Sequence, residues 1–418
     1  MKFNHRLFFT ATMLLLLAVS CAPEMVKQEE ILQVEKVKLG IDVLIGEQLD
    51  LVRGKRIGLI TNPTGVNCDL VPTVDILNDN SEIDLVALFG PEHGVRGAVT
   101  GGDEIENFVD AKTGIPVYSL YGKTRKPNEE MLKDLDVLIY DIQDIGSRAY
   151  TYIYTMAQAM QAAAEYNIPF IVLDRPNPLG GELVEGPILD PQFSSFIGMY
   201  PIPFVYGLTV GELAQLFNTE FDIHCKLTVV PMQGWQRRMT FDDTGLEWVI
   251  TSPHIPHGKT ALFCAATGII GELHTIDTGI GYTLPFELIG EDWIDGEALA
   301  NELNSRGLPG VFFRPLYYKP YYFTRAGAEL QGVQIHITDI RKFQPQRTQI
   351  HILEAIHKLH PEQPIFETTR IGSFQKAMGT DKVQPAILND VDAETIIRSW
   401  DGELREFEKM RQKYLIYD

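Results

Sequence analysis

The sequence predicts an α/β fold, in which a Rossmann-like, mostly parallel sheet domain is followed by a smaller α+β domain. From about residue 40 to residue 173, short apolar runs alternate with helical patterns, which is typical of βαβ units. The 380 residues after position 38 (418 minus 38) exceed what one hydrophobic core usually serves. We therefore expect a Rossmann-like domain at 39–225 and a second, α+β domain at 226–418.

The elements follow from the period of the apolar residues and from their lengths. In the first domain we expect strands at 56–61, 83–89, 135–140 and 168–173, and helices at 70–77, 129–133 and 150–166. In the second we expect helices at 295–304, 348–359 and 393–414 and a strand at 332–338. The aromatic-rich stretch 312–323 fits either cleft lining or core packing, with core packing favoured.

The first 20 residues resemble an export signal. Lys2 and Arg6 precede an apolar run at 7–19 that is too short to cross a bilayer. The run ends in Leu17-Ala18-Val19-Ser20-Cys21, which resembles the lipobox of bacterial lipoproteins and predicts acylation of Cys21. An ordinary signal peptide is the alternative. With residues 21–38 as a charged tether, we expect a lipid-anchored protein of the cell envelope, on the periplasmic or outer-membrane side.

Composition argues against several classes of partner. Residues 1–20 carry Lys2 and Arg6 and no acids, so their removal leaves 34 basic against 56 acidic residues, a net charge of −22. Such a surface repels phosphate backbones, and we expect no nucleic-acid partner. Cys68, Cys225 and Cys264 have no close pairing, which speaks against a disulfide scaffold or a structural zinc site and predicts buried, inert thiols. We expect no cofactor and no metal.

Each of the four predicted strands ends in a polar loop stiffened by glycine or proline. The loops are Asn62-Pro63-Thr64-Gly65, Gly90-Pro91-Glu92-His93-Gly94, Asp141-Ile142-Gln143-Asp144-Ile145-Gly146-Ser147-Arg148 and Asp174-Arg175-Pro176-Asn177-Pro178. Any one loop is equally well explained as an ordinary turn. Because parallel strands share one carboxyl edge, the four loops must converge there, at the edge where such sheets bind ligands.

These loops and their neighbours resemble the exo-β-N-acetylmuramidase family. The matching stretches cover nearly all of 39–416 and are Gly40-Ile41-Asp42, 60–65, 89–94, 140–152, 173–181, 185–187, 206–213, Pro285-Phe286-Glu287 and 332–335. The resemblance implies a Rossmann-like domain, a smaller α+β domain and an active site in the cleft near their junction. It also implies release of terminal N-acetylmuramic acid from the non-reducing end of peptidoglycan-derived saccharides.

One stretch departs from the family pattern. Many members carry a Ser-Glu-Gly-Arg-Gly-like motif before Pro-Phe-Glu, where this chain has Asp277-Thr278-Gly279-Ile280-Gly281-Tyr282. If the missing acid and arginine contact substrate, the specificity of this protein differs from theirs.

Hydrolysis of a glycosidic bond usually needs a carboxylic acid to protonate the leaving oxygen and a second carboxylate. Glu92 is our candidate for the acid, because partial burial on its short loop would raise its pKa. His93 orients Glu92 or stabilises its own loop. For the second carboxylate the candidates are Asp144, Asp141 and Glu272, in that order, although Asp141 could instead cap the following turn.

N-acetylmuramic acid differs from other amino sugars by its lactyl carboxylate, so a pocket specific for this sugar should contain a cationic side chain. Arg148 and Arg175 are the candidates, and their alternative role is to neutralise Asp144 or Asp174. Tyr150 could stack on a sugar ring or belong to the core. The complete set of expected substrate-binding residues is Asn62, Arg148, Tyr150, Asp174, Arg175 and Asn177. Glu212 is set aside, because Thr209-Val210-Gly211-Glu212 has the form of a capping box.

Three other functions compete with a glycosidase. A metal-dependent hydrolase could use Glu92, His93, Asp141, Asp144 and Asp174 as ligands, but no HExxH or similar compact pair is present. A sugar-binding lipoprotein without turnover would also hold its ligand between two lobes. A dehydrogenase is disfavoured, because no GxGxxG follows the first strand.

Overall fold

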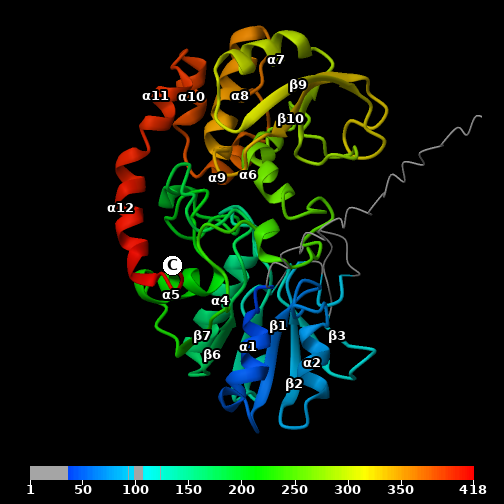
Figure 1. Ribbon diagram of the computed structural model, residues 1–418, viewed down its shortest axis with the longest axis vertical. Helices are drawn as coiled ribbons and strands as arrows, with labels where there is room; N and C mark the ends of the chain where they lie inside the picture. Colours follow the sequence, from blue (N-terminus) through cyan, green and yellow to red (C-terminus); the bar gives the residue numbers. More distant parts are fainter. Residues whose placement is uncertain (1–35, 93, 98–106, 123) are drawn as a thin grey trace, which may run out of the picture. The chain divides into compact units, whose positions relative to one another are not determined.

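The computed structural model describes residues 36–92, 94–97, 107–122 and 124–418 (Figure 1). The expected signal peptide, nearly all of the tether, Cys21 and the candidate His93 lie outside these residues. Among the helices of the described segments, none combines the length and the apolar character that a membrane crossing requires.

A seven-stranded, mostly parallel sheet forms the N-terminal half and confirms the predicted fold class. Its strands lie in the order β3-β4-β2-β1-β5-β6-β7, and β3 pairs with β4 as the antiparallel exception. Their bounds are β1 Arg56–Thr61, β2 Asp84–Gly90, β3 Phe108–Val109, β4 Pro116–Ser119, β5 Val137–Asp141, β6 Phe170–Leu173 and β7 Leu227–Val230.

Helices cover both faces of this sheet, because its strands are apolar on both sides. On β1, Ile57 and Leu59 join the core beneath α1 and α2, whereas Ile60 joins the core beneath α4 and α5. The helices are α1 Gly40–Glu47, α2 Thr73–Asp79, α3 Glu129–Leu132, α4 Tyr152–Glu165 and α5 Val210–Glu220. Sidedness of this kind is expected of a parallel sheet that is buried on both faces.

The sheet is extended on both sides of β1. The chain first adds β2, β3 and β4 on one side of β1, and later adds β5, β6 and β7 on the other side. Thr61 at the end of β1 lies directly opposite Asp141 at the end of β5. These two carboxyl ends therefore form the topological switch point, where ligands bind in open α/β sheets.

The sequence missed four elements of this half. They are α1, β3, β4 and β7, of which β3 and β4 are too short to show a period and β7 is half-exposed. Because β7 pairs with β6, the sheet extends beyond residue 225, where the sequence placed the domain boundary. The division into two domains stays a prediction.

The C-terminal half contains a three-stranded antiparallel sheet in the order β8-β10-β9. Helices α6, α7 and α8 share one apolar core with this sheet. Its elements are α6 Thr260–Gly271, β8 Leu288–Glu291, α7 Gly296–Ser305, β9 Val311–Tyr318, β10 Leu330–Ile337, α8 Pro345–Leu359, α9 Ile371–Met378, α10 Val383–Leu388, α11 Ala393–Arg398 and α12 Asp401–Arg411. Short 3₁₀ turns occur at Leu49–Leu51, Pro191–Phe193, Phe241–Thr244 and Gln412–Tyr414.

The prediction of one helix at 393–414 is wrong, because this segment is broken into α11, α12 and a final 3₁₀ turn. At the break, the Ser399 hydroxyl donates to the Ile396 carbonyl at 2.6 Å, and such side-chain bonds compete with helix continuation. In Figure 1, α12 runs back toward the sheet half and ends beside α5.

The end of the chain is tied to the sheet half. The Ile416 amide donates to the Glu212 carboxylate at 2.8 Å, and the Tyr417 hydroxyl donates to Asp174. Glu212 also accepts from the Thr209 amide at 3.0 Å, which confirms the predicted capping box. The C-terminal residues thus brace the start of α5.

The three described cysteines are free, but only Cys225 is buried, whereas Cys68 and Cys264 are half-buried. Burial raises the pKa of both Cys225 and Cys264 to about 12, which keeps these thiols protonated at neutral pH. The expected full burial is therefore corrected for two of the three.

Gly40 is the point where α1 meets the end of β6. A Cβ atom there would lie within 3.0 Å of backbone atoms of Leu173 and Asp174, and the Gly40 amide donates to the Asp174 carbonyl at 3.0 Å. Gly46 in the same helix has nothing within 4 Å of such a Cβ.

We predict that Gly40→Ala lowers the free energy of unfolding by roughly 1–3 kcal/mol, the cost of overpacking, in urea denaturation. Gly46→Ala is the matched control and should leave stability unchanged or raise it by up to about 1 kcal/mol. Equal effects of the two substitutions would contradict the close packing of α1 on β6.

Candidate active site

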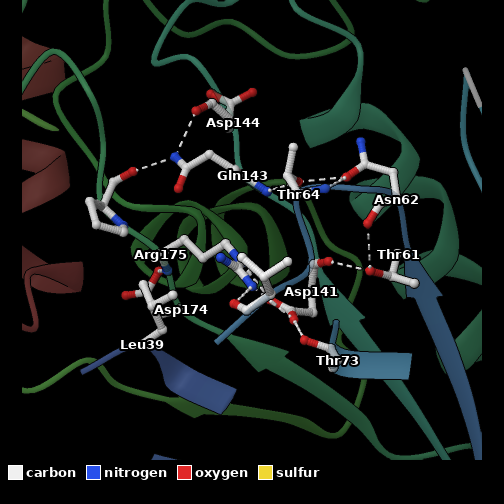
Figure 2. Close-up of polar contacts among 12 residues, drawn as sticks. Leu39, Thr61, Asn62, Thr64, Thr73, Asp141, Gln143, Asp144, Asp174 and Arg175 are labelled. Carbon is white, nitrogen blue, oxygen red and sulfur yellow. Dashed lines mark hydrogen bonds and ion pairs between the residues drawn. The ribbon is translucent and has the colours of Figure 1, made fainter. Parts of the chain in front are cut away.

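Hydrogen bonds join three of the four predicted loops at the switch point (Figure 2). The Thr64 hydroxyl accepts from the Gln143 amide at 2.9 Å, which connects the loop after β1 with the loop after β5. The Gln143 side chain then donates to the Pro176 carbonyl at 2.7 Å, which reaches the loop after β6. Asn62 accepts from the Thr64 amide at 2.9 Å and shapes the first loop. The expected convergence of these loops is present.

Asp141 and Arg175 form a buried ion pair at this edge. Arg175 Nε donates to Asp141 Oδ1 at 2.6 Å and Nη2 donates to Oδ2 at 2.9 Å. Arg175 Nη2 also donates to the Val66 carbonyl at 2.7 Å, and the Thr73 hydroxyl donates to Asp141. Arg175 therefore neutralises Asp141 rather than Asp174, and the pair has a structural role that conflicts with the roles expected of both residues.

Asp174 and Asn177 serve neighbouring backbone groups. Asp174 accepts from the Gly211 amide at 2.8 Å at the start of α5, and burial raises its pKa to about 7. Asn177 donates to the Leu208 carbonyl at 2.9 Å and accepts from the Leu179 amide at 2.9 Å. These bonds occupy the polar atoms that were expected to meet substrate.

Arg148 is fully buried, and its guanidinium is bonded to backbone carbonyls and not to Asp144. Its guanidinium donates to the carbonyls of Pro187 and Ile202 at 2.7 and 2.9 Å. It also donates to Ala377 and Met378 at 3.1 and 2.7 Å, at the negative end of the α9 dipole. Burial lowers its pKa to about 10, so it stays cationic at neutral pH. This geometry favours a structural role for Arg148 over the expected ligand-binding role.

Asp144 is a buried carboxylate with one unpaired oxygen. Its Oδ2 accepts from the Gly146 amide at 2.7 Å and from the Tyr206 hydroxyl, while Oδ1 has no hydrogen-bond partner among the described residues. Burial raises the pKa of Asp144 to about 6. Such a carboxylate can hold or release a proton near neutral pH.

Glu92 lies half-buried in the loop after β2, beside two tyrosines. Burial first, and then the neighbouring Glu92 carboxylate, raise the pKa of Tyr121, whose phenol hydrogen-bonds Glu92. Burial and Tyr150 raise the pKa of Tyr152, and the charge of Glu92 adds to this effect. Glu92 therefore lies near Tyr152, whose ring packs against Tyr150.

A cavity of about 290 Å³ opens next to these loops, and two predicted residues, Tyr150 and Glu272, line it. The Tyr150 ring packs edge-on against Tyr152, with centroids 4.9 Å apart. Among the described residues, the buried Ser147 hydroxyl has no hydrogen-bond partner. Glu272 is paired with Arg370 at 2.9 Å. An unpaired buried hydroxyl in the wall, beside other polar residues, favours a polar ligand in this cavity.

Sequence reasoning did not select most of the cavity residues. The polar ones among them are Ser147, His274, Asp277, Thr278, Thr324 and Arg325. The sequence held two signals that could have identified some of these residues. Ser147 lies in one of the four polar loops, and Asp277, Thr278 and Ile280 belong to the stretch that departs from the family pattern. For Arg325, between β9 and β10, no local pattern marks a site.

Among the described residues, three of the eight non-glycine residues with left-handed φ angles lie in the same cavity wall. His274, Phe286 and Phe323 line the cavity and have φ angles of 58°, 66° and 65°. Bulky residues rarely adopt this left-handed region, and such conformations cluster at functional sites. The strain is independent support for a functional cavity.

Within the described residues, no group of three or more histidine, cysteine, aspartate or glutamate side chains is arranged to hold a metal ion. Asp141 and Asp174, two ligands of the competing metal-dependent hypothesis, are instead occupied by Arg175 and by the start of α5.

The geometry of Arg148 predicts a loss of stability when it is replaced. Arg148→Met would leave four buried carbonyls without their donor, at a cost of about 3–5 kcal/mol in the free energy of unfolding. The exposed Arg405 on α12 provides the matched control, and Arg405→Met should change stability by less than about 0.5 kcal/mol. Weaker sugar binding with unchanged stability would instead favour contact with a ligand.

Comparison with known proteins identifies the family. Models described as exo-beta-N-acetylmuramidase NamZ, N-terminal and C-terminal, match residues 57–259 and 262–417. The chain is 50% identical over 400 residues to the peptidoglycan beta-N-acetylmuramidase NamZ of Bacillus subtilis (strain 168). This match covers 96% of this chain and 95% of that protein.

Two solved structures of DUF1343 family proteins from Bacteroides fragilis NCTC 9343 have similar folds. One has a TM-score of 0.88 at 45% identity and the other 0.72 at 29%, and each match covers 92% of this chain and 99% of the other. With both family models and most of its length matched, this chain belongs to the exo-β-N-acetylmuramidase NamZ family.

Proposed function

We propose that this protein is an exo-acting glycoside hydrolase that releases terminal N-acetylmuramic acid from the non-reducing end of peptidoglycan fragments. The observation that carries the proposal is the 50% identity to a peptidoglycan β-N-acetylmuramidase across nearly the full length of both chains. Because the identity extends over both halves of the chain, the segments that form the sheet edge and the cavity wall both have counterparts in that relative.

Glu92 is the proposed general acid. It is half-buried at the carboxyl end of a central strand, and its neighbours are the phenols of Tyr121 and Tyr152. In its protonated form it would give its proton to the glycosidic oxygen as the bond from that oxygen to the anomeric carbon breaks. Partial exposure is what this role needs, because the carboxyl must reach substrate and be reprotonated from water.

Asp144 is the proposed second carboxylate. Its Oδ1 is buried and has no hydrogen-bond partner among the described residues, whereas both oxygens of Asp141 are bonded to Arg175. The Gly146 amide and the Tyr206 hydroxyl orient its other oxygen. Glu272 lines the cavity, but its pairing with Arg370 makes it the weaker candidate.

The test is release of N-acetylmuramic acid from a disaccharide that carries this sugar at its non-reducing end. We expect release that chelator does not affect and that falls by roughly a hundredfold or more in Glu92→Gln, as for loss of a general acid. Asp144→Asn should cause a loss of similar order. Glu297→Gln, at an exposed glutamate in the first turn of α7, should leave the rate unchanged.

Other outcomes would select another function. Sugar binding without release would favour the sugar-binding lipoprotein, and activity abolished by chelator would favour the metal-dependent hydrolase. Full activity in Glu92→Gln would remove Glu92 from the proposed mechanism while leaving the glycosidase function standing.

We also propose that the mature protein is anchored to the cell envelope through lipid on Cys21. The apolar run at 7–19 and the Leu17-Ala18-Val19-Ser20-Cys21 stretch support this location. A peptidoglycan-degrading enzyme would meet its substrate there.

Growth of the expressing bacterium with an alkyne fatty acid tests the anchor. The parent protein should take up the label and partition into detergent, and Cys21→Ser should do neither. Cys68→Ser, which removes a half-buried cysteine of the folded part, should stay labelled. An unlabelled parent protein would rule out the anchor.

A further inference from the structure

We propose that a row of aromatic rings beside the cavity binds the sugar on the leaving-group side of the scissile bond. This proposal rests on the proposed glycosidase function and extends it to a second sugar-binding subsite. We name the row the aromatic rim, and its members are His254, Tyr282, Tyr318, Tyr321 and Tyr322.

The size of the cavity requires a second subsite. At about 290 Å³ it lies at the lower end of the range for ligand pockets, and mixed polar and apolar walls suit one amino sugar. An exo-acting enzyme that holds the terminal sugar there must leave the next sugar outside the opening. The surface beside the cavity therefore decides how the leaving group is held.

The rim is a continuous series of ring contacts. Centroid distances are 5.5 Å from Tyr318 to Tyr282, 6.4 Å from Tyr282 to Tyr321 and 5.3 Å from Tyr321 to Tyr322. His254 stacks on Tyr322 at 6.2 Å with an interplanar angle of 15°. Tyr318 is buried at one end, whereas Tyr321 and Tyr322 are 65% and 40% exposed. The row thus runs from the core to the surface.

The rim is joined to the cavity by the loop between β9 and β10. Phe323, Thr324 and Arg325 directly follow Tyr321 and Tyr322 and line the cavity. The Tyr321 amide donates to the Gly281 carbonyl at 2.9 Å, which holds the loop against the stretch at 277–282. Tyr321 and Tyr322 therefore lie at the edge of the same wall that Phe323 completes.

Side-chain and backbone hydrogen bonds tie this loop to the cavity wall. Arg325 Nε is 2.6 Å from the buried Glu291 carboxylate, and its Nη2 donates to the His274 carbonyl at 2.9 Å. The Gly327 amide closes the loop on the Pro320 carbonyl at 2.8 Å. A surface held rigid before binding loses little entropy when a ligand packs on it.

Exposed aromatic rings suit a sugar better than other partners. One face of a pyranose presents carbon-bound hydrogens that pack on an aromatic ring, while the tyrosine hydroxyl stays in water to meet the sugar hydroxyls. Nucleic-acid bases also stack on such rings, but the net charge of −20 repels their phosphates. Continuity with the cavity makes the second sugar of the substrate the occupant that we propose.

The test compares two substrates that differ in the leaving group. One is the disaccharide with terminal N-acetylmuramic acid, and the other is β-N-acetylmuramyl fluoride, whose leaving group is too small to reach the rim. We expect Tyr321→Ala to lower kcat/KM for the disaccharide by roughly 3- to 10-fold, the range for removing one aromatic packing partner. For the fluoride the loss should be at most about twofold, and Tyr321→Phe should restore disaccharide hydrolysis.

Tyr317→Ala is the matched control, because Tyr317 is a tyrosine of the adjoining strand that is 73% exposed and lies outside the rim. It should affect neither substrate. Unchanged disaccharide hydrolysis in Tyr321→Ala, or equal losses on both substrates, would overturn the rim proposal and leave the glycosidase function intact. A parent protein that hydrolyses neither compound would overturn both proposals.

Discussion

The buried ion pair between Asp141 and Arg175 is the constraint on which the functional edge of the sheet depends. It connects the end of β5 to the loop after β6, and it reaches the loop after β1 through the Val66 carbonyl and the start of α2 through the Thr73 hydroxyl. A protein tolerates two charges buried away from water only when their hydrogen bonds are satisfied. Removal of one partner of such a pair lowers the free energy of unfolding by about 3–5 kcal/mol. The pair therefore holds three loops in a single arrangement.

This constraint divides the polar residues at the switch point into two groups. Asp141, Asp174, Arg175 and Asn177 are bonded to one another or to backbone and shape the loops. Glu92, which is half-exposed, and Asp144, which has an unpaired buried oxygen, are the two carboxylates of the proposed mechanism. Asp141 and its partner Arg175 fix the start of the loop that carries Asp144.

The C-terminal half completes the site with a different kind of surface. It contributes the apolar wall of α6, the strained residues His274, Phe286 and Phe323, and the loop after β9. Arg148 connects the two halves, because it reaches from the loop after β5 to the carboxyl end of α9. Sheet loops with carboxylates and a preformed cavity with aromatic edges are together what binding and cleavage of a terminal sugar require.

The sequence by itself determined the α/β class, the polar ends of the strands, the capping box at Thr209 and the family. These follow from period and spacing among nearby residues, and from motifs that are read locally. It also identified Tyr150 and Glu272, which reach the cavity. Only the tertiary structure decided which charges are neutralised, because Asp141 finds its partner 34 residues away and Arg148 finds carbonyls as far as 230 residues away. No local pattern encodes such partners, since burial and pairing depend on how distant segments pack.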